Sequence, residues 1–215
     1  MESVENAIKT GVKPQKKITG LILAGGLAKR FGGGKCRAKL KGKPLIALVY
    51  EAISPFCAEI WLSWRKPPYE GPELPFSRII YDERPGAGPA VALNSALKKK
   101  KEGHLLVLPC DQPLVRPKLL KKLIKTVQDE PFWETVVFTD HQRLLPFPGL
   151  YSKATTIENG TLKELVAKTK SLVIPERVWR EWDEKGLSFF NINFREDLKK
   201  AEGLIEKTSP FKTMS

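Results

Sequence analysis

The 215-residue chain is 41% hydrophobic and 9% aromatic, which is typical of a globular protein and excludes a disordered chain. Its net charge of +13 comes from 37 basic and 24 acidic residues, so nucleic-acid and polyanion binding both have to be considered. No apolar run approaches the roughly 18 residues of a membrane span. The chain has three cysteines, Cys36, Cys57 and Cys110, and no two of them have C-x-x-C spacing. Their odd number and their spacing argue against a disulfide framework or a C-x-x-C zinc site.

Strand and helix patterns alternate along most of the chain. In chain order we predict a strand at 18–24, a helix at 44–54, strands at 59–64 and 78–81, a helix at 89–101, a strand at 104–108, a helix at 117–129, a strand at 135–138, an apolar proline-bearing segment at 144–151, a helix at 161–168, strands at 171–174 and 189–193, and a helix at 195–207. This order predicts an α/β fold of three layers, in which helices cover both faces of a mostly parallel sheet.

The two ends of the chain are interpreted as flanking segments of one domain. Residues 1–17 are polar and lack the apolar core of a secretory signal, so we interpret them as a leader. A single domain is predicted over 18–207, followed by a tail at 208–215. Together with the odd number of cysteines, this favours a reducing, cytoplasmic location.

The glycine-rich loop after the first predicted strand is the most informative stretch. The segment ITGLILAGGLAKRFGGGKCRAKL passes from an apolar run into five glycines, with Lys29, Arg30 and Lys35 among and after them. Glycine lets backbone N–H groups approach an anion, and the cations neutralise its charge. We therefore predict a phosphate-binding loop.

Spacing decides which phosphate loop this is. A P-loop is excluded because Lys35 is followed by Cys36 rather than by serine or threonine. The glycine positions do not fit a dinucleotide fingerprint, and the chain lacks the H-R-D and D-F-G motifs of kinases. The remaining pattern, L-A-G-G-x-x-x-R-F-G-x-x-K, is typical of nucleotidyltransferases that use a nucleoside triphosphate as donor.

The densest basic block, Lys98 to Lys101, closes the helix predicted at 89–101. Cations at a helix C-terminus complement the helix dipole, and no aromatic residues are interleaved for base stacking. We therefore expect a solvated helix end and no nucleic-acid partner.

Polar side chains follow several of the predicted strands. The glycine loop follows the strand at 18–24, Asp82 follows 78–81, Asp111 follows 104–108, and Asn191 and Asn193 belong to 189–193. In open α/β sheets ligands bind beyond the carboxyl ends of the strands. These groups are therefore expected to lie in one binding site at the carboxyl edge of the sheet. The alternatives are that Asp111 caps a helix, that Asp82 is an ordinary turn residue, and that the two asparagines cap a turn.

Four segments in order resemble the molybdenum cofactor guanylyltransferase family. They are the loop 23–35, D-x-x-x-G-x-G-P at 82–89, P-C-D-Q-P at 109–113 and F-N-I-N-F-R-E-D-L at 190–198. The resemblance runs from about residue 18 to about residue 202. It implies the Rossmann-like nucleotidyltransferase fold and transfer of GMP from GTP to the phosphate of molybdopterin, with Mg²⁺ as cofactor and pyrophosphate as by-product.

The resemblance also implies roles for individual residues. The implied catalytic residues are Lys35, Asp111 and Arg30, and Asp111 is the implied Mg²⁺ ligand. The nucleotide-binding residues are Leu23, Ala24, Gly25, Gly26, Lys35, Asp82 and Asp111. Asn191 and Asn193 are placed on the pterin or metal side. The implied partners are GTP, molybdopterin loaded with molybdenum or tungsten, other cofactor-assembly proteins and target molybdoenzymes.

Two positions depart from the family pattern. Gly34 stands before Lys35 where an acidic residue is usual, and Trp64 stands where the family often carries an asparagine. A cytidylyltransferase would typically read T-A-A-G at Leu23 to Gly26, so the loop favours GTP. An adenosylcobinamide-phosphate guanylyltransferase shares the glycine loop and the N-I-N tail, and a non-catalytic nucleotide-binding protein remains a third hypothesis.

Overall fold

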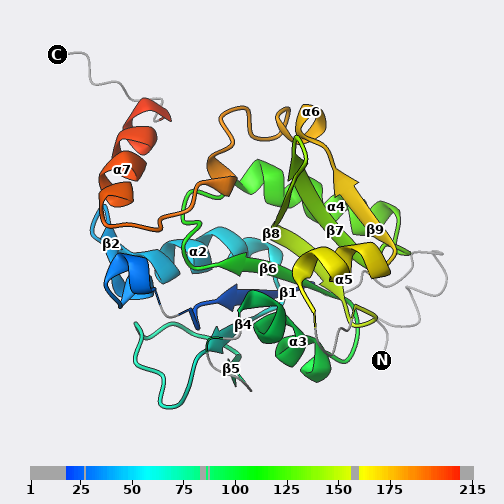
Figure 1. Cartoon of the computed structure of the whole chain (residues 1–215), viewed down its shortest axis with the longest axis horizontal. Coiled ribbons are helices and arrows are strands. Elements are labelled where there is room, and N and C mark those ends of the chain that lie inside the picture. The colour runs from blue at the N-terminus through cyan, green and yellow to red at the C-terminus, as the bar shows by residue number, and fades with distance from the viewer. Residues whose placement is uncertain (1–17, 27, 83–85, 87, 156–159, 209–215) are drawn as a thin grey trace, which may run out of the picture.

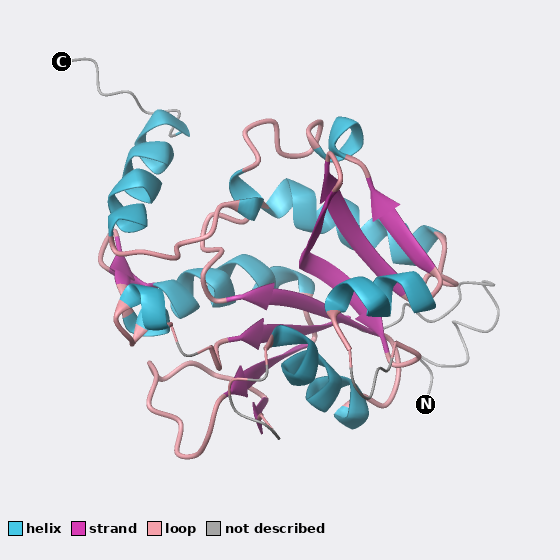
Figure 2. Ribbon diagram, in the orientation of Figure 1, coloured by secondary structure: helices cyan, strands magenta, loops and turns pink. Residues whose placement is uncertain are grey.

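The computed structural model describes residues 18–26, 28–82, 86, 88–155 and 160–208. Within these residues one seven-stranded sheet runs in the order β5-β4-β1-β6-β8-β7-β9 (Figures 1 and 2). Its strands are β1 (Ile18–Leu23), β4 (Glu59–Trp64), β5 (Arg78–Tyr81), β6 (His104–Pro109), β7 (Thr135–Asp140), β8 (Arg143–Ser152) and β9 (Ser171–Ile174). A separate antiparallel pair joins β2 (Lys39–Leu40) to β3 (Lys43–Pro44).

Helices connect the strands and cover the sheet. The α-helices are α2 (Leu45–Ile53), α3 (Pro89–Lys99), α4 (Pro117–Asp129), α5 (Leu162–Lys168), α6 (Glu176–Trp179) and α7 (Glu196–Thr208). Short 3₁₀ turns are η1 (Lys29–Phe31), η2 (Lys35–Arg37), η3 (Ser54–Phe56) and η4 (Leu187–Phe189). None of the described helices is long and apolar enough to cross a membrane.

Two buried clusters lie on opposite faces of the sheet. Alternate residues of a strand point to opposite faces, so Ile22 packs with α2 and α4, whereas Leu21 packs with α3 and α5. Strands β5, β4, β1 and β6 are parallel to one another, and so are β7 and β9. Strand β8, between β6 and β7, runs antiparallel to both. The predicted three-layer, mostly parallel α/β architecture is confirmed.

The apolar segment at 144–151 forms most of β8, the antiparallel strand. Its prolines, Pro146 and Pro148, fall where the pairing with β7 is irregular, between the pairs Phe138–Leu145 and Val136–Leu150. Proline lacks the N–H that a regular ladder requires, so it is tolerated at such an irregularity. The prolines thus obscured a strand that the apolar pattern alone would have indicated.

The strand predicted at 189–193 is wrong. The backbone N–H of Ile192 donates to the carbonyl of Asp111 (2.9 Å), and those of Asn193 and Phe194 donate to the Asp197 carboxylate (3.0 and 2.9 Å). These bonds replace a strand ladder and hold a loop between η4 and α7.

Sequence patterning also missed the four-residue helix α6. The one-domain assignment stays a prediction; residues 1–17 and 209–215 lie outside the described residues, and Thr208 ends α7.

Candidate active site

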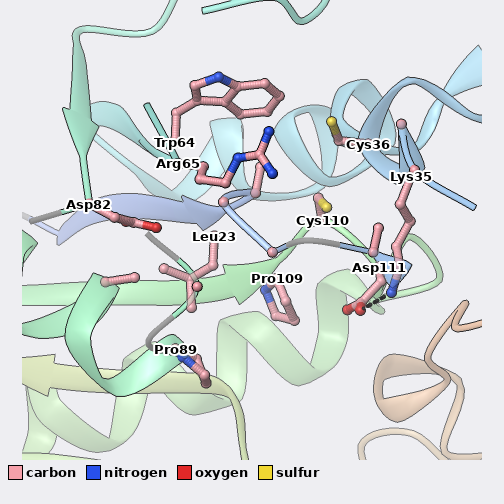
Figure 3. A pocket seen from close by; sticks show the side chains of 18 of the residues that line it. Leu23, Lys35, Cys36, Trp64, Arg65, Asp82, Pro89, Pro109, Cys110 and Asp111 are labelled. Carbon is pink, nitrogen blue, oxygen red and sulfur yellow. Dashed lines mark hydrogen bonds and ion pairs between the residues drawn. The ribbon is translucent and has the colours of Figure 1, made fainter. Parts of the chain in front are cut away.

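A cavity of about 630 Å³ opens at the carboxyl edge of the parallel strands (Figure 3). Its walls come from the glycine loop after β1, the ends of β4, β5 and β6, the start of α3, one residue of β8 and the loop after η4. Segments far apart in the sequence meet here because parallel strands present all their carboxyl ends at one edge. The cavity lies at the edge of the sheet where the sequence predicts a shared binding site.

Lys35 and Asp111 form an ion pair at one side of the cavity (Figure 3). Lys35 Nζ lies 2.8 Å from Asp111 Oδ2 and 3.4 Å from Asn193 Oδ1. The Lys35 and Asp111 side chains are only 14% and 20% exposed, so water screens the pair weakly. Helix α4 begins at Pro117 with Arg116 at its N-cap, so Asp111 does not cap that helix.

Gly34 explains how Lys35 reaches this position. It lies in the left-handed region (φ 61°, ψ 21°) and is the N-cap of η2. Glycine adopts that conformation at little steric cost. The local backbone therefore favours glycine over the acidic residue that the resemblance leads us to expect at this position.

Asp82 and Gly25 lie in close contact near the ends of β5 and β1. Ser63 Oγ donates to Asp82 Oδ1 (2.8 Å), and a Cβ placed on Gly25 would lie 2.5 Å from Asp82 Oδ2. The Ala24 amide donates to the Ser63 carbonyl, whereas the amides of Gly25 and Gly26 have no backbone partner among the described residues. Two donors and one carboxylate are thus available to a ligand.

Burial raises the pKa of the Asp82 carboxyl, against the opposing effect of the Ser63 hydrogen bond. A raised pKa means that ionised Asp82 lowers stability at neutral pH, and that this cost disappears as pH falls below the ordinary carboxyl pKa of about 3.9. We expect Asp82→Asn to be more stable than the parent at pH 7, with a difference that shrinks toward pH 4. Urea unfolding across this range measures it, and a difference independent of pH would contradict the prediction.

Most of the predicted site residues line the cavity. These are Leu23, Ala24, Gly25, Gly26, Lys35, Asp82, Asp111 and Asn191. Asn193 is not part of the lining but reaches Lys35. Arg30 is exposed on η1 and does not line the cavity, so the structure does not bring it to the other predicted residues.

Sequence reasoning missed three basic residues of the cavity wall, Arg37, Arg65 and Lys66. Arg37 donates to the Glu70 carbonyl at 3.4 Å, and Arg65 has no hydrogen bond or ion pair among the described residues. Arg65 directly follows β4, as Asp82 follows β5, so the strand-end argument would have found it. Among the described residues none of the three side chains forms an ion pair with a carboxylate. Such positive charge is suited to binding phosphate.

The cysteines at the cavity are not poised as nucleophiles. Burial raises the pKa of the Cys36 thiol and, more strongly, that of Cys110. A thiol attacks only as the thiolate, so both groups stay protonated near pH 7. They serve as small packed side chains.

Asp111 has an oxygen that fits a metal ion. Its Oδ2 accepts from Lys35, but its Oδ1 is buried and has no hydrogen-bond partner among the described residues. Mg²⁺ prefers hard oxygen ligands and is commonly held by one or two carboxylates plus substrate phosphates. The described residues also contain one three-residue cluster of potential metal ligands, formed by Asp140, His141 and Glu176. It lies between the β7–β8 turn and α6, and none of its residues lines the cavity.

Comparisons with known proteins agree with the fold and the motifs. The model of a MobA-like NTP transferase domain matches residues 20–177. A molybdenum cofactor guanylyltransferase of Desulfosudis oleivorans is 28% identical over 199 residues, covering 88% of this chain and 96% of the relative. A relative of the same name from Shewanella woodyi is 28% identical over 201 residues, covering 89% and 98%.

Solved structures give the same picture. Molybdopterin-guanine dinucleotide biosynthesis protein A from Archaeoglobus fulgidus superimposes with a TM-score of 0.72 at 25% identity, covering 88% of this chain and 99% of that one. A CMP:2-keto-3-deoxy-manno-octonic acid synthetase at 14% identity and a TM-score of 0.63 shares the fold. The family match spans most of the chain and includes the glycine loop and the Asp111 segment. The chain therefore belongs to the MobA-like NTP transferase domain family and is a nucleotidyltransferase of the Rossmann-like fold.

Proposed function

We propose that this chain transfers GMP from GTP to the phosphate of molybdopterin, in a Mg²⁺-dependent reaction that forms molybdopterin guanine dinucleotide and pyrophosphate. The names of its relatives support this reaction. Within the site, the observation that carries it is the Lys35–Asp111 pair, whose carboxylate keeps one buried oxygen without a hydrogen-bond partner among the described residues. A cation and a metal-binding carboxylate side by side are what transfer at phosphorus requires.

The nucleotide is assigned to the side of the cavity formed by β5, β4 and β1. The amides of Gly25 and Gly26, which have no backbone partner among the described residues, donate to the nucleotide. Leu23 and Ala24 shape the wall beside them. The Asp82 carboxylate only accepts hydrogen bonds, so it pairs with the N–H groups on the edge of guanine.

Chemistry is assigned to the Lys35–Asp111 side. An oxygen of the acceptor phosphate attacks the α-phosphorus of GTP, the bond to the β-phosphate bridging oxygen breaks, and pyrophosphate leaves. The nucleophile is already ionised, so no side chain has to remove a proton. Lys35 and Arg37 neutralise the phosphates, and Asp111 would hold Mg²⁺, which when bound supplies charge stabilisation for the transferred group.

The acceptor is assigned to the loop between η4 and α7. Asn191 lines the cavity, with its Nδ2 donating to the Phe189 carbonyl (3.1 Å), and Asn193 contacts Lys35. Their amides can pair with the polar edge of a pterin. A cytoplasmic setting, delivery of molybdenum- or tungsten-loaded molybdopterin by other assembly proteins, and release to target molybdoenzymes belong to this proposal.

A nucleotide-preference assay tests the proposal. The full chain is mixed with Mg²⁺, equimolar GTP, CTP or ATP, and either molybdopterin or adenosylcobinamide phosphate as acceptor. Pyrophosphate and the nucleotide product are measured. We expect product from GTP. Product from CTP alone would favour a cytidylyltransferase, and product only with adenosylcobinamide phosphate would favour the cobinamide enzyme. If GTP binds but no pyrophosphate is released with either acceptor, the remaining hypothesis is a non-catalytic nucleotide-binding protein.

A further inference from the structure

We propose that the indole of Trp64 is the wall of the nucleotide site on which the purine base of the donor stacks, and that this ring raises the preference for purine over pyrimidine triphosphates. The inference rests on the proposed function for the identity of the donor, and it adds a specificity-determining residue at the same site. Trp64 ends β4 and its side chain lines the cavity.

Trp64 and Asp82 lie at the carboxyl ends of two neighbouring strands. The register of the sheet pairs Trp64 with Tyr81, and the amide of the next residue, Asp82, donates to the Trp64 carbonyl (3.0 Å). Figure 3 shows Trp64 and Asp82 at one side of the cavity and the Lys35–Asp111 pair at the other. A base between Trp64 and Asp82 would be presented with one aromatic face and one hydrogen-bonding edge, at a distance from the reacting phosphates.

Neighbouring aromatic rings fix the orientation of the indole. Trp64 meets Tyr69 edge to face, with ring centroids 4.9 Å apart and an interplanar angle of 83°. Tyr69 donates its hydroxyl to the Pro72 carbonyl (2.8 Å) and meets Phe76 edge to face, and Phe76 in turn meets Tyr50 of α2. This series anchors the indole to the core. A ring that is already held loses little conformational entropy when a base binds.

Part of the indole remains exposed in the wall of the cavity. Trp64 is half-buried, and its N–H has no hydrogen-bond partner among the described residues. Stacking depends on overlapping ring area, so a bicyclic purine gains more from this wall than a pyrimidine does. Selection by ring size at Trp64 is thus separate from selection by hydrogen bonding at Asp82.

Calorimetry of the full chain in Mg²⁺, without any acceptor, tests the proposal. The ligands are GTP, CTP and inorganic tripolyphosphate; the variants are Trp64→Leu, Trp64→Phe and, as a matched control, Trp133→Leu, a half-buried indole outside the cavity. We expect Trp64→Leu to weaken GTP binding by about 10- to 100-fold, to weaken CTP binding less, and to leave tripolyphosphate within about twofold. Trp64→Phe should fall in between.

Tripolyphosphate separates stacking from a structural effect, since it carries the charge without a base. An equal loss for GTP and tripolyphosphate would overturn the inference in favour of a structural role, and unchanged GTP binding would exclude base contact. Absence of any purine nucleotide binding to the parent would overturn it as well. Trp64-dependent binding of GTP or ATP without transfer to molybdopterin would uphold the stacking wall while the proposed function fails.

Discussion

Replacing Asp111 with alanine is expected to lower the rate of nucleotidyl transfer in Mg²⁺ by about a thousandfold, because it removes the carboxylate assigned to the metal and the partner of Lys35. The fold should survive. Asp111 does not cap α4, and its structural bond to Ile192 uses the backbone carbonyl, which alanine retains. Pyrophosphate release measures the rate, and circular dichroism with thermal unfolding checks the fold.

Two comparisons make this result specific. Asp111→Asn preserves the shape of the side chain but not its charge, so we expect a loss of similar size and a higher Mg²⁺ requirement. Asp129→Ala removes an exposed carboxylate paired with Lys125 on α4, outside the cavity, and should turn over normally. An Asp111→Ala protein with near-normal turnover in Mg²⁺ would end the assignment of this residue to the metal.

Replacing Gly25 with alanine is expected to disrupt the nucleotide side of the site. The new Cβ would lie 2.5 Å from Asp82 Oδ2 and 3.2 Å from the Arg65 backbone nitrogen. Ser63 holds the Asp82 carboxylate from its other oxygen, so relief of the clash displaces this hydrogen-bonded group. We expect a loss of about 1–3 kcal/mol in the free energy of unfolding and at least about a tenfold loss in GTP affinity.

Gly26 provides the matched control for stability. A Cβ on Gly26 meets nothing within 4 Å, so Gly26→Ala should change the free energy of unfolding by no more than about 0.5 kcal/mol. Urea unfolding of both variants and calorimetry of Gly25→Ala with GTP provide the data. Equal stability losses for the two variants would show that the loop backbone, rather than the contact with Asp82, governs the effect.

Local features of the sequence determined much of the architecture. The strand at 59–64 and the helix at 117–129 have the predicted bounds, because their apolar periodicities are unambiguous and proline marks the helix start. The glycine loop likewise follows the first strand as predicted, because the apolar run ends directly at the glycines. In contrast, the alternation of Phe190 to Phe194 resembles a strand but belongs to a loop, since a short alternating run does not specify its hydrogen-bond partners.

The sequence by itself determined the order of strands and helices, the phosphate-binding character of the glycine loop and the polar groups that follow the strands. Only the tertiary structure decided which of these groups meet. Lys35 and Asp111 are 76 residues apart and pair because β1 and β6 are neighbours in the sheet. Arg65 and Arg37 line the same cavity, whereas Arg30 faces solvent. Periodicity and turn chemistry act over a few residues, but the contents of a cavity depend on how the whole chain packs.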